Sequence, residues 1–268
     1  MGLAVGRPSG RQVGLKTDLP HDAAQALSRM KHHTSRRTAP HAHGAEETRQ
    51  RISREAARIM AEEGVRDFHT AKRKAAERLN LPEARQLPSN QEIEQALTEH
   101  LQLFHARQLP ETLRHLRSLA VKAMQLLERF EPRLVGSLLS GNVTRFSEIQ
   151  LHVTAETPEI VAFFLQEHGI PYEETSKRLR FGGDRSEMVP VYGFLVEDTD
   201  PQGHGSVVEG TTPGMGEVGQ RREQLSRMPG ATAIEVSVFT PKAAREAPLS
   251  PVDSRPMKRA SLKEVETL

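Results

Sequence analysis

The sequence contains no cysteine and no tryptophan, and aromatic residues make up only 4% of its 268 residues. Without cysteine, the chain cannot form disulfide bonds, iron–sulfur clusters, thiolate zinc sites or a cysteine nucleophile. The absence of cysteine also fits a reducing compartment, and we expect a cytoplasmic protein. Hydrophobic residues make up 36% of the chain, which is little for a single core of this size. We therefore expect part of the chain to stay outside the folded core.

Long apolar segments and a strong charge imbalance are also absent. No run of about eighteen apolar residues occurs, so the sequence predicts no transmembrane helix and no membrane partner. The formal net charge is only +2, so the charge of the whole chain gives no argument for nucleic-acid binding. The sequence also lacks the phosphate loop of P-loop proteins, the Gly-x-Ser-x-Gly elbow and the His-Glu-x-x-His motif. Those catalytic classes are therefore excluded.

Composition and periodicity divide the chain into four parts. Residues 1–45 are rich in Gly, Arg, His, Ser and Pro, which predicts a disordered basic tail. Residues 46–130 repeat apolar residues at three-to-four spacing, which predicts a helical region. Residues 131–241 favour strands with one helix, and a polar, Gly-rich stretch at about 197–230 predicts a flexible insertion between two of those strands. Residues 242–268 predict an extended tail with a short helix near its end.

Capping and stop signals predict four helices in the second part. The first helix is expected to end at Gly64, and Asp67 is placed to open the second. Ser89 or Asn90 can cap a third helix, because both side chains accept hydrogen bonds from the first free N–H groups. The fourth helix is expected over residues 111–129, where leucine and alanine form a continuous apolar stripe.

The second of these helices carries a basic cluster, formed by Lys72, Arg73, Lys74 and Arg78. Together with the break at Gly64, the cluster is compatible with a helix-turn-helix that reads DNA. Lys and Arg on a helix more often form a solvated face, and several acidic residues dilute this charge. Nucleic-acid binding by this region therefore stays a weakly supported alternative.

The strand around which the candidate site is organised begins at Glu148. Its alternation puts Glu148, Gln150 and His152 on one face and apolar residues on the other. A second strand far downstream repeats this pattern, with Glu235 on its polar face. We predict that the two strands are neighbours in one mixed sheet, with both acids on the same face and a helix at 158–168 packed on the apolar face.

The order of these residues resembles the DNA polymerase beta-like nucleotidyltransferase superfamily. Its signature is Gly-Ser, then about ten residues, then acid-x-acid on a strand, and a third acid on a later strand. Gly136-Ser137, Glu148-Ile149-Gln150 and Glu235 occupy those places. The chain departs from the pattern at Gln150, which stands where the superfamily has its second metal-binding carboxylate.

The resemblance covers about residues 130–241 and implies a fold as well as a function. Ala71–Glu77 and Ala247–Asp253 add a likeness to a bacterial group in which this domain follows a helical region. The expected class is α+β, with an N-terminal helical region followed by a small mixed β-sheet with flanking helices.

The activity implied by the resemblance is transfer of a nucleoside monophosphate from a nucleoside triphosphate to an acceptor, with Mg²⁺ or Mn²⁺ as cofactor. The acceptor would be a protein, an RNA or a small molecule. By resemblance, Glu148, Gln150 and Glu235 are the catalytic residues, with Glu148 and Glu235 as metal ligands. Gly136 and Ser137 would bind the triphosphate through the backbone and the hydroxyl group.

Other interpretations of the same residues stay open. Gln150 favours a non-catalytic module that senses a nucleotide or binds a partner, because an amide supplies no charge for a metal ion. The basic cluster favours a nucleic-acid-binding regulator. Without any site, Glu148 and Glu235 would be two acids on an open, solvent-facing sheet.

Overall fold

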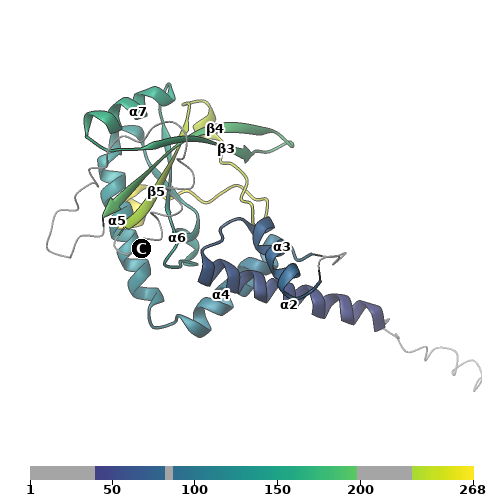
Figure 1. Ribbon diagram of the computed structural model, residues 1–268. Helices are drawn as coiled ribbons and strands as arrows, with labels where there is room; N and C mark the ends of the chain where they lie inside the picture. The colour runs from purple at the N-terminus through teal and green to yellow at the C-terminus, as the bar shows by residue number, and fades with distance from the viewer. Residues whose placement is uncertain (1–39, 82–86, 198–230) are drawn as a thin grey trace, which may run out of the picture. The chain divides into compact units, whose positions relative to one another are not determined.

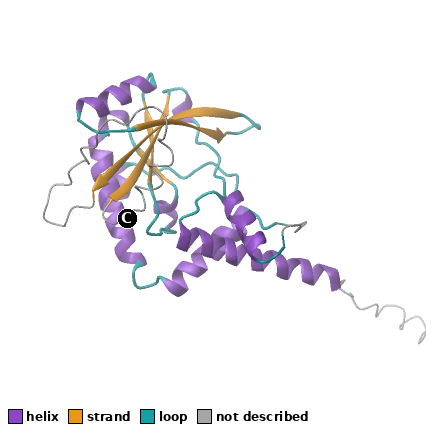
Figure 2. Cartoon of the chain, viewed as in Figure 1, coloured by secondary structure: helices purple, strands orange, loops and turns teal. Residues whose placement is uncertain are grey.

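The computed structural model describes residues 40–81, 87–197 and 231–268. Most of the predicted tail (residues 1–39) and most of the predicted insertion (residues 198–230) lie outside the described residues. The chain divides into two units, residues 1–45 and 46–268, and the fold described below is that of the second. Its helices are followed by a five-stranded mixed sheet with flanking helices, which confirms the predicted α+β class (Figure 1; Figure 2).

The helical region contains α2 (Pro40–Glu63), α3 (Phe68–Arg78), α4 (Asn90–Phe104) and α5 (Leu109–Leu126). Helix α2 begins inside the segment for which the sequence predicts a disordered tail, and proline is well tolerated in a first helical turn. The Asp67 side chain accepts a hydrogen bond from the Thr70 N–H and caps α3, as predicted. Ser89 and Glu92 form a reciprocal capping box that fixes the start of α4.

The five strands are β1 (Arg133–Val135), β2 (Ile149–Thr154), β3 (Glu173–Arg180), β4 (Ser186–Glu197) and β5 (Ala231–Phe239). They lie in the order β1-β2-β5-β4-β3. Strands β2 and β5 are parallel, whereas the other neighbouring pairs are antiparallel. The last strand is therefore inserted between β4 and β2, which makes the two strands of the candidate site neighbours.

One face of the β2–β5 pair forms the centre of the main core. Helix α7 (Pro158–Glu167) packs on this face, as predicted, and buries Val161, Phe164 and Leu165. Ile160 and Phe163, expected to pack as well, are exposed. Helix α5 belongs to the same core and contributes Leu116, Leu119, Ala120, Ala123 and Met124. The strands contribute Ile149, Leu151, Val153, Ile234, Val236 and Val238. Since this row is buried, the alternate residues of both strands must point to the other face.

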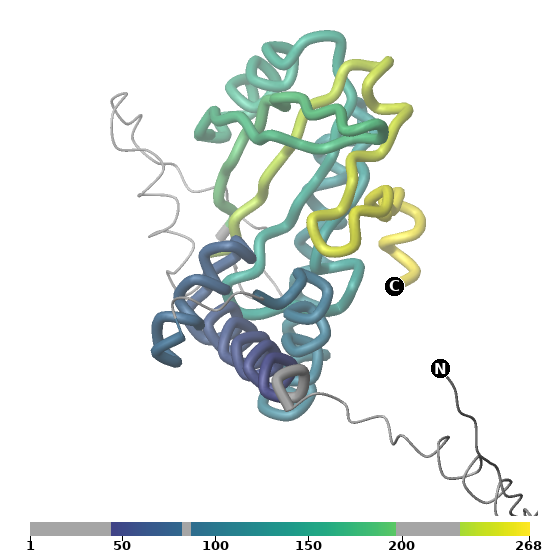
Figure 3. The backbone as a smooth tube through the Cα atoms, turned by 90° about the vertical axis from the view of Figure 1, so that its right-hand side faces the viewer, coloured from purple at the N-terminus to yellow at the C-terminus, as the bar shows by residue number. Residues whose placement is uncertain are grey.

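The C-terminal segment, predicted to be an extended tail, is attached to the edge of the sheet. Leu134 and Ala260 exchange two backbone hydrogen bonds, of 2.8 and 2.9 Å, so the segment lies beside β1 (Figure 3). The predicted short helix is present as α9 (Leu262–Glu266), and its Val265 reaches the main core. The segment thus covers an edge strand that would otherwise present free backbone groups.

Candidate functional site

The parallel register of β2 and β5 sets the geometry of the candidate site. Gln150 lies directly beside Glu235, and His152 lies beside Ser237. Glu148 immediately precedes β2, and the alternation of the strand puts it on the same side as Gln150. The prediction that the two strands are neighbours is confirmed, with Gln150 rather than Glu148 at the level of Glu235.

Gly136 and Gln150 are in direct contact at one end of this face. Val135, the last residue of β1, pairs with Gln150, and Gly136 follows it as the N-cap of the short helix α6 (Ser137–Ser140). Gly136 has φ +81° and ψ −152°, a region that is almost restricted to glycine. A Cβ atom at this position would overlap the amide oxygen of Gln150. The Gly136-Ser137 turn therefore lies against the middle residue of the acid-x-acid pattern.

Replacing Gly136 with alanine is expected to lower the free energy of unfolding by about 2 kcal/mol, because of backbone strain and displacement of Gln150. The matched control is Gly141→Ala. Gly141 also has positive φ, at +80°, but nothing lies within 4 Å of an added Cβ. The control is expected to cost only about 1 kcal/mol, from strain alone. Urea unfolding of both variants measures the difference, and equal losses would contradict the contact with Gln150.

Glu148 is buried, and an arginine from the helical region compensates its charge. Its side chain is only 2% exposed, and it forms an ion pair with Arg66. Arg66 lies in the short connection between α2 and α3. The acid is therefore not the solvent-facing residue of the open-sheet interpretation, and the helical region contributes directly to this site.

Glu235 has a different cationic partner. Lys177 of β3 places its Nζ 2.8 Å from the Glu235 carboxylate, reaching across β4. Gly193, the β4 residue directly opposite Glu235, has no side chain. Each of the two predicted metal ligands thus pairs with its own cation, from two elements outside the sequence motif.

The donor set on this face is short of carboxylates for a two-ion site. Within residues 40–81, 87–197 and 231–268, no group of three or more His, Asp or Glu side chains is arranged to hold a metal ion. The oxygen donors on this face are the Gln150 amide and the Glu235 carboxylate, which the register pairs, and the carboxylate of Glu148, which immediately precedes β2. Oxygen donors of this kind suit Mg²⁺ or Mn²⁺, and their number fits one ion better than two.

His152 lies two residues further along the same face, close enough to Glu235 for this carboxylate to act on its pKa. It is 6% exposed, and its ring lies 4.7 Å from the Phe239 ring, measured between centroids. Its Nδ1 is buried and has no hydrogen-bond partner among the described residues. Burial is the main cause that lowers the pKa of His152 to about 4, and Arg259 and Lys177 lower it further. The imidazole is therefore neutral at physiological pH.

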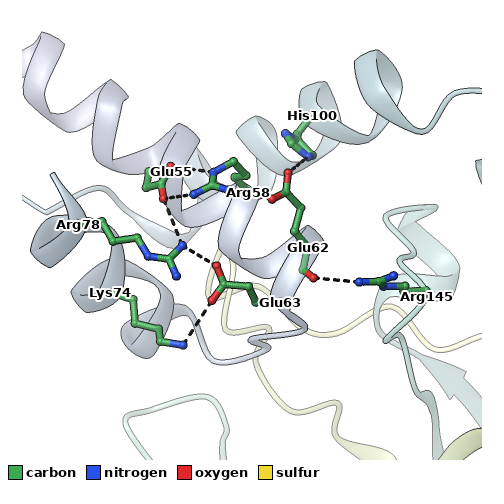
Figure 4. A network of polar contacts seen from close by, with 8 residues as sticks. All are labelled: Glu55, Arg58, Glu62, Glu63, Lys74, Arg78, His100 and Arg145. Atoms are coloured by element: carbon green, nitrogen blue, oxygen red, sulfur yellow. Dashed lines mark hydrogen bonds and ion pairs between the residues drawn. The ribbon is translucent and has the colours of Figure 1, made fainter. Parts of the chain in front are cut away.

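The basic cluster on α3 is partly occupied by ion pairs with α2 (Figure 4). Arg78 lies 2.5 Å from Glu63 and 3.5 Å from Glu55, and Lys74 lies 3.5 Å from Glu63. The hydrogen bond from Arg78 is the first cause that lowers the pKa of Glu63. A nucleic-acid interaction of α3 would therefore have to compete with these ion pairs for two of the four cations.

The structure brings Gly136, Gln150 and Glu235 of the sequence motif into one region of the sheet. Sequence reasoning missed the role of Arg66 as the partner of Glu148. No periodic signal could have revealed it, since Arg66 lies in a turn and its partner is distant in the sequence.

Comparison of the chain with protein-family models, with curated proteins and with solved structures finds no match in any of the three. In the part of the chain that the structure describes, none of the helices has the length and apolar character needed to cross a membrane.

Proposed function

We propose that the protein is a nucleotidyltransferase that transfers a nucleoside monophosphate from a nucleoside triphosphate to an acceptor. The observation that supports this proposal is the parallel pairing of β2 with β5. This pairing puts Gln150 beside Glu235 on one face of the sheet, with Glu148 just before β2. Gly136 lies against Gln150 at the end of this face. The resemblance to the polymerase beta-like superfamily predicts this grouping for a nucleotide site.

Glu148 and Glu235 would hold one divalent cation, Mg²⁺ or Mn²⁺, with the amide oxygen of Gln150 as a neutral third donor. Such a cation stabilises the charge that builds up on the α-phosphate oxygens and lowers the pKa of the attacking hydroxyl group. The chain supplies one negative charge fewer than a three-carboxylate site. For this reason we propose a site with one ion.

Arg66 and Lys177 would exchange partners when the nucleotide binds. In the structure they pair with the two acids. A triphosphate would bring oxygen atoms that a guanidinium or ammonium group binds strongly, and Glu148 and Glu235 would then be left to hold the divalent cation. Gly136 allows the close approach of a phosphate to the backbone, and the Ser137 hydroxyl group can donate to it. Each acid and each cation would thus keep a partner of opposite charge after the nucleotide binds.

The proposal is tested by incubating the full chain with each α-³²P-labelled nucleoside triphosphate and Mg²⁺ or Mn²⁺. Protein, RNA and small-molecule acceptors are supplied in separate reactions. We expect metal-dependent release of pyrophosphate together with label on one acceptor class. Absence of both transfer and nucleotide binding, the latter measured by equilibrium dialysis, would contradict the proposal.

A second function, nucleotide binding without transfer, is favoured by the amide at Gln150 and by the ion pairs of both acids. A site whose carboxylates already have cationic partners can bind and report a nucleotide without holding a catalytic metal ion. The partner in that case would be a protein that responds to nucleotide binding.

Replacing Gln150 with aspartate separates the two functions. The Gln150→Asp variant is expected to bind Mn²⁺ about tenfold more tightly than Gln150→Asn, because it adds a negative charge beside Glu235. The asparagine variant is the matched control, since it shortens the side chain equally without adding charge. The metal concentration that gives half-maximal transfer is measured for both variants and for the unmodified chain. If only the Gln150→Asp variant transfers nucleotide, the result favours nucleotide binding without transfer as the function of the unmodified chain. Equal Mn²⁺ affinities of Gln150→Asp and Gln150→Asn would show that the metal ion does not bind beside residue 150.

A further inference from the structure

An open cavity of about 590 Å³ lies at the carboxyl ends of β2 and β5, next to the nucleotide site proposed above. Its lining consists of Arg129, Glu131, Arg133, His152, Val153, Thr154, Phe239, Pro241, Ala244, Arg245 and Arg259. His152 lies two residues beyond Gln150 along the strand, which corresponds to about 7 Å. The volume is typical of a site for a small molecule.

The four arginines reach this cavity from four different segments. Arg133 lies on β1 directly opposite His152, and Arg129 belongs to the turn η2 (Glu128–Phe130). Arg245 comes from the turn η3 (Ala243–Arg245). Arg259 comes from the C-terminal segment and donates a hydrogen bond of 2.7 Å to the Ala244 carbonyl oxygen. The next residue, Ala260, pairs with Leu134 of β1 and holds this segment in place.

The protein balances the positive charge of this cluster only in part, through Glu131 in the lining and through Glu264, which interacts electrostatically with Arg133. Among the residues that the structure describes, no carboxylate lies within 4.0 Å of any of the four guanidinium groups. Glu131 is the single acid in the lining. Burial and the proximity of Arg133 lower the pKa of Arg259, so two like charges face each other. The neutral ring of His152 leaves that repulsion unchanged.

We propose that this cavity binds the phosphate group of a small phosphorylated molecule, held by Arg129, Arg133, Arg245 and Arg259. A phosphate dianion matches the excess charge better than a carboxylate, and its oxygen atoms accept paired hydrogen bonds from guanidinium groups. Phe239, Pro241 and Ala244 give the cavity an apolar side against which the rest of the molecule packs. This one-sided lining and the limited volume favour a small molecule over a nucleic-acid strand. Phosphate binding in this cavity does not require the proposed nucleotidyl transfer.

The test is calorimetric titration of the full chain with ribose 5-phosphate, ribose and inorganic phosphate in separate runs at low salt. Ribose 5-phosphate is expected to bind saturably at millimolar concentrations or below, inorganic phosphate no more tightly, and ribose not at all. In the Arg133→Ala, Arg259→Ala double variant we expect the affinity for ribose 5-phosphate to fall on the order of 100-fold. Each arginine contributes about tenfold through charge-assisted hydrogen bonds.

The matched control is the Arg114→Ala, Lys122→Ala double variant, which removes two positive charges from exposed positions of α5 outside the cavity. It is expected to bind as the unmodified chain does. Should the Arg133→Ala, Arg259→Ala variant fail to fold, Arg245→Ala takes its place, because Arg245 is exposed. We expect the affinity of Arg245→Ala for ribose 5-phosphate to fall about tenfold.

Several results would overturn the proposal. One is equal affinity for ribose 5-phosphate in the cavity variant and in the control variant. Another is binding of ribose as tight as that of ribose 5-phosphate, and a third is no binding of ribose 5-phosphate or of inorganic phosphate. Binding of inorganic phosphate with exclusion of ribose 5-phosphate would overturn the assignment to a phosphorylated molecule. Binding of an RNA oligonucleotide that depends on Arg133 and Arg259, without binding of ribose 5-phosphate, would assign the arginines to nucleic acid instead.

Discussion

Replacing Glu235 with glutamine is expected to reduce metal-dependent nucleotidyl transfer by on the order of 100-fold or more, while the fold is retained. The amide has the size of the carboxylate but no charge, so the proposed cation loses one of its two charged ligands. A bound cation contributes several kcal/mol to stabilisation of the transition state, and a loss of about 2.7 kcal/mol already corresponds to 100-fold. Lys177 also loses its carboxylate partner, and this ion pair on a partly exposed surface contributes little to stability.

The matched control for this variant is Glu174→Gln. Glu174 lies on β3 opposite Tyr192, is exposed, and points to the other face of the sheet. It undergoes the same change of charge and is expected to keep the full rate. Rates are compared at saturating nucleotide over a range of Mn²⁺ concentrations. Equal rates for the two variants would show that Glu235 does not bind the catalytic cation.

The stability of the protein is expected to fall by about 3 kcal/mol between pH 6.5 and pH 4 because of His152 alone. Burial lowers the pKa of His152 in the folded state from 6.5 to about 4. Within this pH window the unfolded chain takes up a proton and the folded protein does not, so the free energy of unfolding decreases as the pH falls. Above pH 6.5 the ring is neutral in both states, and the full contribution is present.

The variant that isolates this effect is His152→Phe, which keeps an aromatic ring against Phe239 and removes the buried nitrogen without a partner. It is expected to match or exceed the unmodified protein at pH 7, because the desolvated polar atom is gone. Urea unfolding of both proteins from pH 4 to pH 7.5 gives two curves whose difference belongs to His152. A difference that does not change with pH would contradict the burial of a neutral imidazole.

Local signals in the sequence were sufficient for most of the individual elements. Asp67 and the Ser89–Glu92 box cap the helices at the predicted positions. The alternation around Glu148 and Glu235 gave the correct buried face of each strand, because a slip of one residue would expose the whole apolar row. Such signals depend on side chains within a few residues of one another, so they can be read from one sequence.

Non-local contacts could not be predicted in the same way. The pairing of Arg66 with Glu148 and of Lys177 with Glu235 joins residues far apart in the sequence. The sequence position of an acidic or basic residue does not predict which distant residue forms an ion pair with it. These two pairs change the electrostatics of the site, since the sequence alone indicates bare carboxylates.

The arginine cavity could not be predicted from the sequence either, because it also depends on a non-local contact. Arg259 lies in a segment that composition describes as an extended tail, and only its pairing through Ala260 with Leu134 brings it to β1. A segment of low apolar content can still dock when it completes the hydrogen bonds of an edge strand.

The measurement that tests the central claim most directly is titration of Mn²⁺ into the full chain with a non-hydrolysable nucleoside triphosphate analogue. Free Mn²⁺ is followed by electron paramagnetic resonance. The proposed site predicts one tightly bound Mn²⁺ per chain in addition to the Mn²⁺ that the free analogue binds, and loss of this ion in Glu235→Gln. Retention of the ion in that variant, or no binding beyond that of the analogue alone, would contradict a nucleotide site on the β2–β5 face.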